Sequence, residues 1–333
     1  MTFPVDSSVL SAAALAERLL PAYALPGIPA CRLVNRGDND TYLVTAGGRR
    51  FALRAWNHER SNAAEVEGEL ELLDAIGGAG VPVARPIRRR DGAFMQSVRA
   101  PEGPRFVALF AFADGRAPGR DITPAQGHAL GRAVADMHAA MDALGGRLAR
   151  PRLDLARLLD EPVAALLPEL AQRPDDAAFL RDLRGRLAEG AGGLPETRPA
   201  FGLCHSDLHK ENVLFADDGG LTILDFDCCG YGWRAYELAV MLWSTRWLPQ
   251  AEAVRAAYLR GYGEVRPLDA AELAALPFFV AIQDVCIAHV QLSLARRGVQ
   301  GARPVDDRFF DAHLGFLRAW MTAVAAGTYL GGP

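Results

Sequence analysis

The chain has 333 residues, of which 50% are hydrophobic and 23% charged, and its formal net charge is −4. This length predicts about two domains, and the small negative charge gives no reason to expect nucleic acid or a membrane as the main partner. Five cysteines in so long a chain do not resemble a disulfide framework, and we expect neither a signal peptide nor a membrane span of about 18 uninterrupted apolar residues, so the sequence predicts a cytoplasmic protein.

The first 110 residues alternate short apolar runs with turns. A helix is expected over 7–20, with Ser7 or Ser8 as its N-cap. A second helix, capped by Ser61, follows the third β-like run. The β-like runs stand at 31–35, 41–46, 49–56, 84–88, 93–98 and 105–112, with a glycine turn at 47–48. This pattern predicts a small, mostly antiparallel sheet that carries one long helix.

Residues 113–120 are rich in Gly, Pro and Asp and are the best candidate for an interdomain linker. Thr123 followed by Pro124 is typical of a helix start, and the rest of the chain is mainly helical. Helices are expected over 124–144, 153–171, 175–190, 234–246, 250–262, 270–296 and 306–326. The exception is 201–227, where two apolar runs flank the turn "ADDGG" and predict a hairpin.

Three polar side chains stand at the edges of this hairpin. Asp207 and Asn212 lie in the loop that enters its first strand, and Asp225 ends the second. Antiparallel pairing brings the two strand ends together, so these side chains are expected to converge. Two carboxylates and an amide oxygen are hard ligands that suit Mg²⁺, which commonly completes its shell with substrate phosphates. The spacing therefore suggests a nucleotide–metal site with one carboxylate left for proton transfer.

The segment "HSDLHKEN" at 205–212, followed by "LDFD" at 224–227, resembles the catalytic loop and metal-binding segment of kinases. It is most similar to the aminoglycoside phosphotransferase/choline kinase superfamily, including its homoserine-kinase-like and bacterial stress-kinase-like members. Weaker similarities follow in the same order over most of the chain, in "GDNDTYLV", "FALRAW", "GELELL", "LFAFADGRAP" and "GYGWRAYELAVMLW".

The resemblance implies an α+β, two-lobed protein-kinase-like fold. A nucleotide-binding lobe over 1–112 would contain the antiparallel sheet and its helix. The linker at 113–120 would join it to a mainly helical catalytic and substrate lobe over 121–333.

The resemblance also implies a role for individual residues. Asp207 would accept or orient the proton of the substrate hydroxyl, and Asn212 and Asp225 would hold Mg²⁺ on the ATP phosphates. His205 would brace the loop. Contacts to the nucleotide would come from Asn39 in the turn over the phosphates, Arg54 with its partner Glu69, and the backbone near Phe110 and Phe112.

Several positions depart from the family pattern or leave a choice open. Arg54 stands where protein kinases carry lysine. Arginine keeps the positive charge and adds a bidentate fork. Glu65, Glu67 and Glu71 compete with Glu69 on spacing alone. The other departures are Ser206 for glycine, Lys210–Glu211 for Pro-Gly, Glu237 for aspartate, and Asp227 for glycine, where Asp227 would touch a second metal or cap a turn.

Other residues invite different chemistry. The group Cys204, His205, His209, Cys228 and Cys229 lacks the spacing of a zinc site, and Cys204 is expected in the core rather than as a nucleophile. Of the aromatic residues after 230, Tyr231 and Trp233 are expected in a loop and could meet the substrate, whereas Tyr236, Trp243 and Trp247 fit one face of a core helix.

These observations predict an ATP- and Mg²⁺-dependent phosphotransferase acting on a hydroxyl of a small molecule: an amino alcohol, a hydroxy amino acid, a sugar or an aminoglycoside-like compound. A bacterial protein serine/threonine kinase is the alternative within enzymes, although no A-P-E-like end of an activation segment is recognisable. A nucleotide-binding pseudokinase-like module is the alternative of another class. The sequence fixes neither the acceptor nor the oligomeric state.

Overall fold

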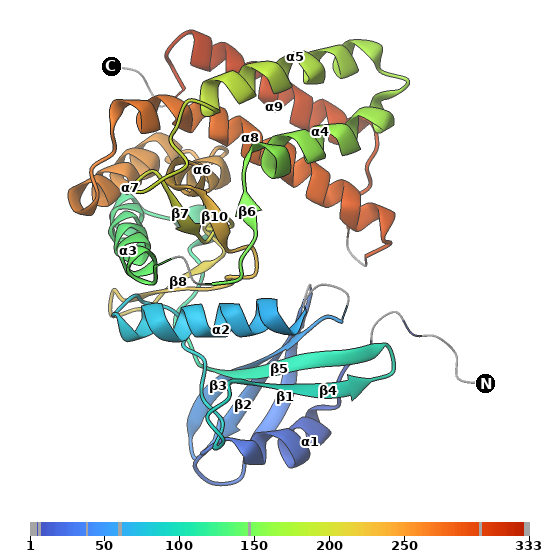
Figure 1. The fold of residues 1–333 in the computed structure, drawn as a ribbon, viewed down its shortest axis with the longest axis vertical. Helices are drawn as coiled ribbons and strands as arrows, with labels where there is room; N and C mark the ends of the chain where they lie inside the picture. The colour runs from blue at the N-terminus through green and yellow to red at the C-terminus, as the bar shows by residue number, and fades with distance from the viewer. Residues whose placement is uncertain are drawn as a thin grey trace. The chain divides into compact units, whose positions relative to one another are not determined.

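The computed structural model describes residues 5, 8–37, 39–58, 62–145, 148–299 and 302–329. Its contacts divide the chain into two compact units (Figure 1). Unit 1 comprises Met1–Arg116, Arg147–Arg150 and Leu214–Leu224, and unit 2 comprises Ala117–Gly146, Pro151–Val213 and Asp225–Pro333. The boundary after Arg116 falls inside the 113–120 stretch, and the functional division into 1–112 and 121–333 remains a prediction.

Unit 1 is built on an antiparallel sheet with the strand order β1-β2-β3-β5-β4. The Gly47–Gly48 turn between β2 and β3 has positive φ at both residues, which glycine adopts at little cost. The strands are β1 (Ala30–Arg36), β2 (Asn39–Ala46), β3 (Arg49–Trp56), β4 (Met95–Ala100) and β5 (Gly103–Ala111).

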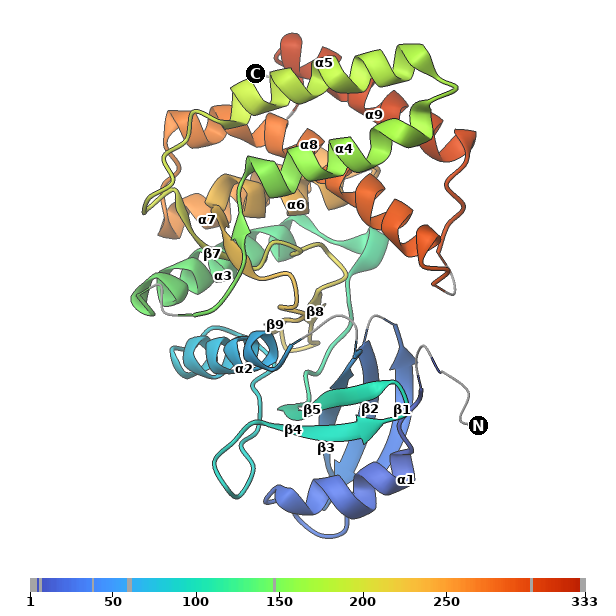
Figure 2. The same ribbon diagram turned by 45° about the vertical axis from the view of Figure 1, so that its right-hand side comes forward.

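The two faces of this sheet carry different helices, as Figures 1 and 2 both show. Alternate residues such as Val44, Leu53 and Leu109 point to one face and join a core with Leu15 and Leu19 of the N-terminal helical segment. That segment consists of α1 (Ala12–Ala14), η1 (Leu15–Leu19) and η2 (Leu20–Ala22). The other face carries Arg54, whose side chain reaches α2 (Ala63–Gly78).

Three local expectations in unit 1 need correction or fall outside the described residues. The N-cap of the first helix is Ser11, not Ser8, while Ser7 and Ser61 lie outside the described residues. Asn62 caps α2 by accepting from the Glu65 N–H. Residues 84–88 form only an isolated bridge at Pro86 instead of a strand, because Pro82 and Pro86 supply no N–H for a ladder.

Unit 2 is mainly helical, and most of its helices match the expected ranges. Thr123 and Gln126 form a capping box with Pro124 in the first turn of α3. The helical elements are α3 (Pro124–Ala143), η4 (Ala156–Asp160), α4 (Glu161–Leu166), η5 (Leu167–Leu170), α5 (Pro174–Ala191), α6 (Arg234–Ser244), α7 (Ala251–Val265), α8 (Ala270–Arg296) and α9 (Asp307–Ala325), with η3 (Gly119–Asp121) before them.

Helix α8 is long and apolar enough to cross a membrane by length and composition alone. However, 61% of its apolar window is buried inside the protein, and α6 packs along it. This is the pattern of a core helix.

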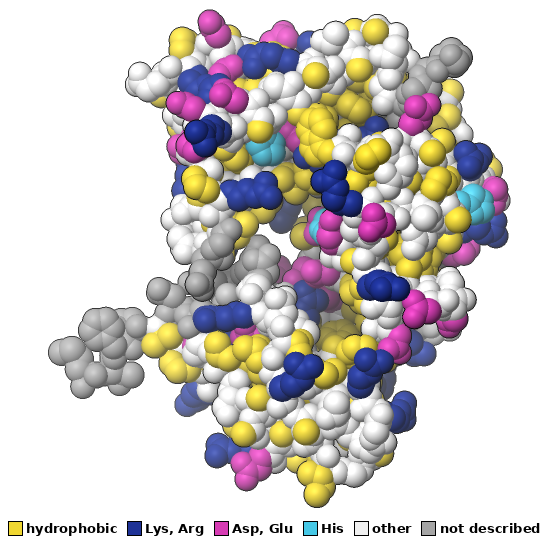
Figure 3. Space-filling view, turned by 180° about the vertical axis from the view of Figure 1, so that it is seen from behind, with side chains coloured by type: hydrophobic (Ala, Val, Ile, Leu, Met, Phe, Trp, Pro, Cys, Tyr) yellow, Lys and Arg dark blue, Asp and Glu magenta, His cyan; other side chains and the backbone are white. Residues whose placement is uncertain are grey.

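Short strands complete the fold. In unit 2, β10 (Gly230–Trp233) pairs in parallel with β6 (Arg152–Leu153) and antiparallel with β7 (Phe201–Cys204). The expected hairpin is present as β8 (Val213–Phe215) and β9 (Leu221–Ile223). An antiparallel N-terminal sheet followed by a mainly helical remainder is the α+β fold that the sequence predicts. On the face drawn in Figure 3, basic and acidic side chains are interspersed.

Candidate active site

The predicted catalytic segments leave and enter two paired strands of unit 2. β7 and β10 run antiparallel, with Cys204 opposite Gly230. The loop that leaves β7 and the segment that enters β10 therefore lie at one edge of the small sheet. The first carries Asp207 and Asn212, and the second carries Asp225.

Asp207 and Asn212 are brought together directly. The Asn212 Nδ2 donates to the backbone oxygen of Asp207 at 2.9 Å and to its carboxylate Oδ2 at 3.3 Å. The amide group is thereby oriented with its nitrogen toward Asp207, and Oδ1 is the atom left for a cation. His209 also approaches this carboxylate, with its Nε2 at 3.6 Å from the same Oδ2.

Asp225 occupies an unusual backbone conformation beside this loop. Its φ is +63°, and Ser206 has φ +70°; these are the non-glycine residues with positive φ in the described ranges. Left-handed backbone at such residues is costly and concentrates at functional sites. The His205 ring packs on Phe226, with ring centroids 4.4 Å apart, so the residue before Ser206 and the residue after Asp225 are in contact. This contact is consistent with the bracing role predicted for His205, which stays a prediction.

Glu237 on α6 is hydrogen-bonded to the backbone of this loop. Its Oε2 accepts the backbone N–H of Ser206 at 3.0 Å, immediately before Asp207. The Glu237 carboxyl is fully buried, and burial raises its pKa to about 7, although the N–H groups of Ser206 and His205 and the charge of Arg234 act in the opposite direction. Ser206 stands where the family carries glycine, and its φ is one that glycine adopts without strain. The family's glycine at this position is therefore explained by the backbone conformation.

The loop residues between Asp207 and Asn212 form a small ionic group. His209 Nδ1 lies 3.1 Å from Glu211 Oε2, and Lys210 Nζ lies 2.7 Å from Glu211 Oε1. The contact with His209 is the main reason that the pKa of Glu211 falls to about 2. Burial acts to lower the pKa of His209, but Glu211 and Asp207 outweigh it and raise that pKa.

In unit 1, the predicted nucleotide residues lie on β2, β3, α2 and β5. Arg54 Nη1 donates to Glu69 Oε1 at 3.2 Å. Glu69 is only 2% exposed, whereas Glu65, Glu67 and Glu71 are exposed. The structure therefore joins Arg54 to the glutamate that the resemblance implies.

The remaining nucleotide candidates of unit 1 take part in local contacts. Asn39 starts β2, and its Oδ1 accepts from the Asn57 N–H at 3.2 Å. Phe110 lies buried in β5, paired with Ala52 of β3. Phe112 directly follows β5. The guanidinium carbon of Arg50 lies over the Phe112 ring, 4.3 Å from the ring centroid.

Two alternative interpretations change with the structure. Trp247 is not on the face of a core helix: it follows the end of α6 and is 65% exposed. Trp233 is not in a loop: it ends β10, is 2% exposed and contacts Phe201 and Phe279. It is therefore a core residue. Tyr231, also on β10, is half-buried. All five cysteines are free thiols. Cys204 is buried, as expected, and Cys229 is buried as well.

Residues that the sequence did not single out lie close to Glu237 and to one another. His138 of α3, Arg234 of α6 and Tyr262 of α7 are buried, and His138 Nε2 lies 3.8 Å from Glu237 Oε2. Glu237 was visible in the sequence only as a departure from aspartate. A single histidine inside an ordinary helical pattern carries no sequence signal, because its partner is 99 positions away.

Known proteins place this chain in a family. The model of the phosphotransferase enzyme family matches residues 31–276. An uncharacterised protein of Deinococcus radiodurans is 40% identical over 329 residues, covering 96% of this chain and 92% of the relative. A homoserine kinase of Neisseria meningitidis is 33% identical, covering 72% of this chain and 74% of the relative. The chain belongs to the phosphotransferase enzyme family, and the predicted class of enzyme, a phosphotransferase, is confirmed.

Solved structures agree at the level of the fold. A microcompartment-associated aminopropanol kinase has a TM-score of 0.75 at 23% identity, covering 96% of this chain and 99% of its own. An amicoumacin kinase in complex with AMP-PNP and Ca²⁺ has a TM-score of 0.69 at 20% identity, covering 91% and 90%. The kinase-like α+β fold expected from the sequence is thus confirmed.

Proposed function

We propose that the protein transfers the γ-phosphoryl group of ATP, with Mg²⁺, to a hydroxyl group of a small amino alcohol or hydroxy amino acid. The observation that carries the proposal is the loop in which Asn212 Nδ2 holds the Asp207 carboxylate at 3.3 Å. A carboxylate fixed in this way is suited to take a proton from an incoming alcohol.

The proposed reaction needs only ATP, the acceptor alcohol and the bound metal ion. The acceptor oxygen forms a bond to the γ-phosphorus while the bond from that phosphorus to the β,γ-bridging oxygen breaks, and ADP leaves. Asp207 receives the hydroxyl proton. Positioning and charge neutralisation supply most of the catalysis in such transfers.

The residues present fit a magnesium ion. Asp225 offers a carboxylate and Asn212 an amide oxygen, which are the hard ligands that Mg²⁺ takes together with water and phosphate oxygens. Bound there, the ion would neutralise phosphate charge. The amicoumacin kinase was solved with AMP-PNP and Ca²⁺, which supports a nucleotide and a divalent cation as ligands of this chain.

Unit 1 supplies the proposed nucleotide contacts. Arg54, held by Glu69 at 3.2 Å, would bind the α- and β-phosphates, and Asn39 would help shape the turn over the phosphates. Backbone groups near Phe110 and Phe112 would bind adenine.

The choice of acceptor rests on relatives. Homoserine kinases recur among them, at 28–33% identity, and the structure with a TM-score of 0.75 is an aminopropanol kinase. Both names describe a small molecule that carries an amino group as well as a hydroxyl. This favours an amino alcohol or hydroxy amino acid over a sugar.

The test is a screen for transfer of labelled γ-phosphate to amino alcohols, hydroxy amino acids, sugars, aminoglycosides and a generic protein. We expect transfer to a member of the first two groups. Asp207→Asn should lower kcat by about 10²–10⁴-fold and keep the thermal stabilisation by Mg·ATP. The matched control Asp217→Asn changes a carboxylate in the exposed β8–β9 turn and should keep full activity.

Each outcome of the screen separates the alternatives. Transfer only to the protein substrate would make the chain a protein kinase. Stabilisation by Mg·ATP without transfer to any class would make it a nucleotide-binding module. Nearly intact turnover in Asp207→Asn would remove Asp207 from the role of base.

A further inference from the structure

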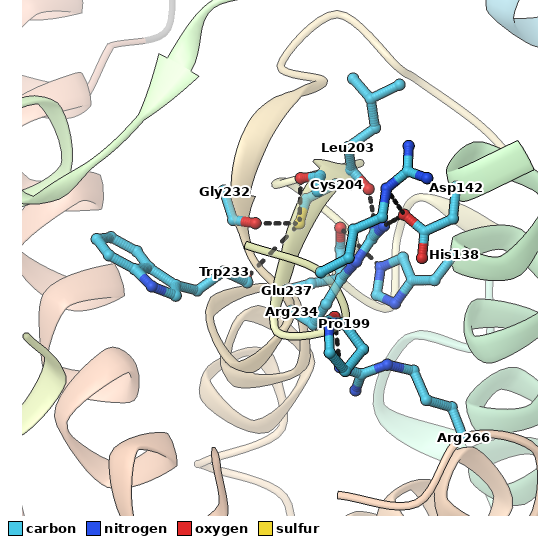
Figure 4. Close-up of polar contacts among 12 residues, drawn as sticks. His138, Asp142, Pro199, Leu203, Cys204, Gly232, Trp233, Arg234, Glu237 and Arg266 are labelled. Atoms are coloured by element: carbon cyan, nitrogen blue, oxygen red, sulfur yellow. Dashed lines mark hydrogen bonds and ion pairs between the residues drawn. The ribbon is translucent and has the colours of Figure 1, made fainter. Parts of the chain in front are cut away.

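A buried polar cluster lies around the end of β7 in unit 2, where the predicted catalytic loop begins (Figure 4). His138 of α3, Cys204 of β7, and Arg234 and Glu237 of α6 are all 0% exposed. Arg234 donates to the backbone oxygen of Leu203 and, at 2.6 Å, to the Asp142 carboxylate. Burial of so many polar groups is costly unless they satisfy one another.

A bound cation is one explanation of this cluster, but its charges argue against it. Ligand atoms of His138, Cys204 and Glu237 lie within 4.8 Å of one another. However, burial raises the pKa of the Cys204 thiol, which opposes the thiolate that a metal would need. The fixed charge of Arg234 lies in the same cluster, so a second cation would be repelled. A hydrogen-bond chain explains the cluster better.

The hydrogen bonds from Arg266 through Tyr262 to His138 have a defined donor-to-acceptor direction. Arg266 Nη1 donates to the Tyr262 hydroxyl at 3.0 Å, and that hydroxyl lies 2.8 Å from His138 Nδ1. Because the guanidinium only donates, the Tyr262 proton is available for Nδ1. Burial lowers the pKa of His138 well below its usual value, so the ring is neutral and its single proton lies on Nε2.

The Nε2–H points toward the carboxylate that holds the loop. Nε2 lies 3.8 Å from Glu237 Oε2, the atom that accepts the Ser206 N–H. Within the described ranges, Nε2 of His138 and Oε1 of Glu237 are both buried without a hydrogen-bond partner. A distance of 3.8 Å exceeds a hydrogen bond. The contact nevertheless places the unsatisfied His138 Nε2–H next to the Glu237 carboxylate, and an unsatisfied buried donor costs about 1–3 kcal/mol.

We propose that His138 is a positioning residue for phosphoryl transfer: its Nε2 proton orients the Glu237 carboxylate, which fixes the Ser206 backbone and so the place of Asp207. This inference rests on the proposed role of Asp207. Tyr262 and Arg266 complete the chain by setting the histidine tautomer. No part of it touches substrate, so its removal should alter turnover rather than nucleotide affinity.

The test compares two amides at position 138. His138→Gln keeps a donor near the place of Nε2, whereas His138→Asn keeps a group near the place of Nδ1 and removes the donor that faces Glu237. Both variants delete the imidazole from the same buried position, so a merely structural role predicts similar losses in the two. We expect Asn to lower kcat at least tenfold more than Gln, with the KM for ATP unchanged in both.

A second readout does not depend on knowing the acceptor. Hydrogen exchange of the peptide over 201–213 should accelerate in His138→Asn and stay close to wild type in His138→Gln. Equal exchange and equal kcat in the two variants would overturn the positioning role. If the two variants differ in hydrogen exchange but the protein phosphorylates no acceptor, the positioning role of His138 stands and the proposed function is rejected.

Discussion

At the scale of single residues, the loop around Asp207 is held in a strained geometry by buried groups. Ser206 has φ +70°, a conformation that costs a non-glycine residue of the order of 1 kcal/mol or more. Its N–H is bound by Glu237 at 3.0 Å. The strain therefore persists because a buried carboxylate on another element fixes the backbone there.

Glu237 should make stability depend on pH. Burial raises its pKa in the folded protein from 4.5 to about 7, so the folded state holds this proton more tightly than the unfolded state. Its favourable contribution is complete below about pH 4.5 and is lost as the pH rises through about 7. Relative to wild type, Glu237→Gln should gain on the order of 3 kcal/mol of unfolding free energy between these pH values.

Denaturant unfolding of both proteins at a series of pH values measures this difference. Because glutamine does not titrate, ionising groups that do not interact with Glu237 cancel in the comparison. A constant difference from pH 4.5 to 8 would mean that Glu237 keeps an ordinary pKa.

At the scale of elements, two pairings bring distant segments together. The β7–β10 register sets Cys204 opposite Gly230 and thereby aligns the Asp207 loop with the Asp225 segment. On the sheet of unit 1, the alternation of β3 turns Leu53 to the core and Arg54 to α2. In each case a two-residue period or a register decides which side chains meet.

Glu69 on α2 should be the glutamate that supports nucleotide binding. Glu69→Gln removes the charge that lies 3.2 Å from Arg54 Nη1, so we expect the KM for ATP to rise about tenfold, equivalent to about 1.4 kcal/mol. Glu67→Gln is the matched control, because Glu67 lies on the same helix and is exposed. Steady-state kinetics over ATP concentration tests this, and equal KM values in the two variants would separate Glu69 from the nucleotide.

At the scale of the whole molecule, the chain consists of two units with different proposed roles: unit 1 contacts the nucleotide, and unit 2 holds the metal ion and the catalytic carboxylate. Unit 1 carries Arg54 and Glu69, and unit 2 carries Asp207, Asn212 and Asp225. Two units permit more than one unfolding transition, so a single midpoint need not describe the protein.

Mg·ATP should stabilise the folded protein. A ligand that binds only the native state adds about 2.7 kcal/mol at 100 times its Kd, so the Tm should rise with ATP and Mg²⁺. Asp225→Ala, which removes a proposed ligand of the ion, should abolish the magnesium dependence of this rise. The measurement is thermal unfolding with ATP in the presence of Mg²⁺ or EDTA. An unchanged Tm at millimolar Mg·ATP would contradict a nucleotide site.

The sequence by itself determined the fold class, most elements and the family. Apolar periodicity and turn residues act over a few positions, so the sheet strands, Gly47–Gly48 and Thr123–Pro124 were predictable. It failed at Ser11 and Asn62, because other possible cap residues stand close by in the sequence, and at 84–88, where Pro86 has no N–H to donate to a neighbouring strand. The motif at 205–212 and 224–227 identified the kinase-like segments because its spacing is local.

Only the tertiary structure decided which buried groups support that motif. Glu237 was no more than a departure in the sequence, and His138 and Tyr262 carried no signal, yet they lie 3.8 Å and 2.8 Å from their partners. Trp233 was misplaced for the same reason: the pairing of β10 with β7 is a contact between distant segments. Such contacts depend on how helices and strands pack in space, and no spacing along the chain encodes them.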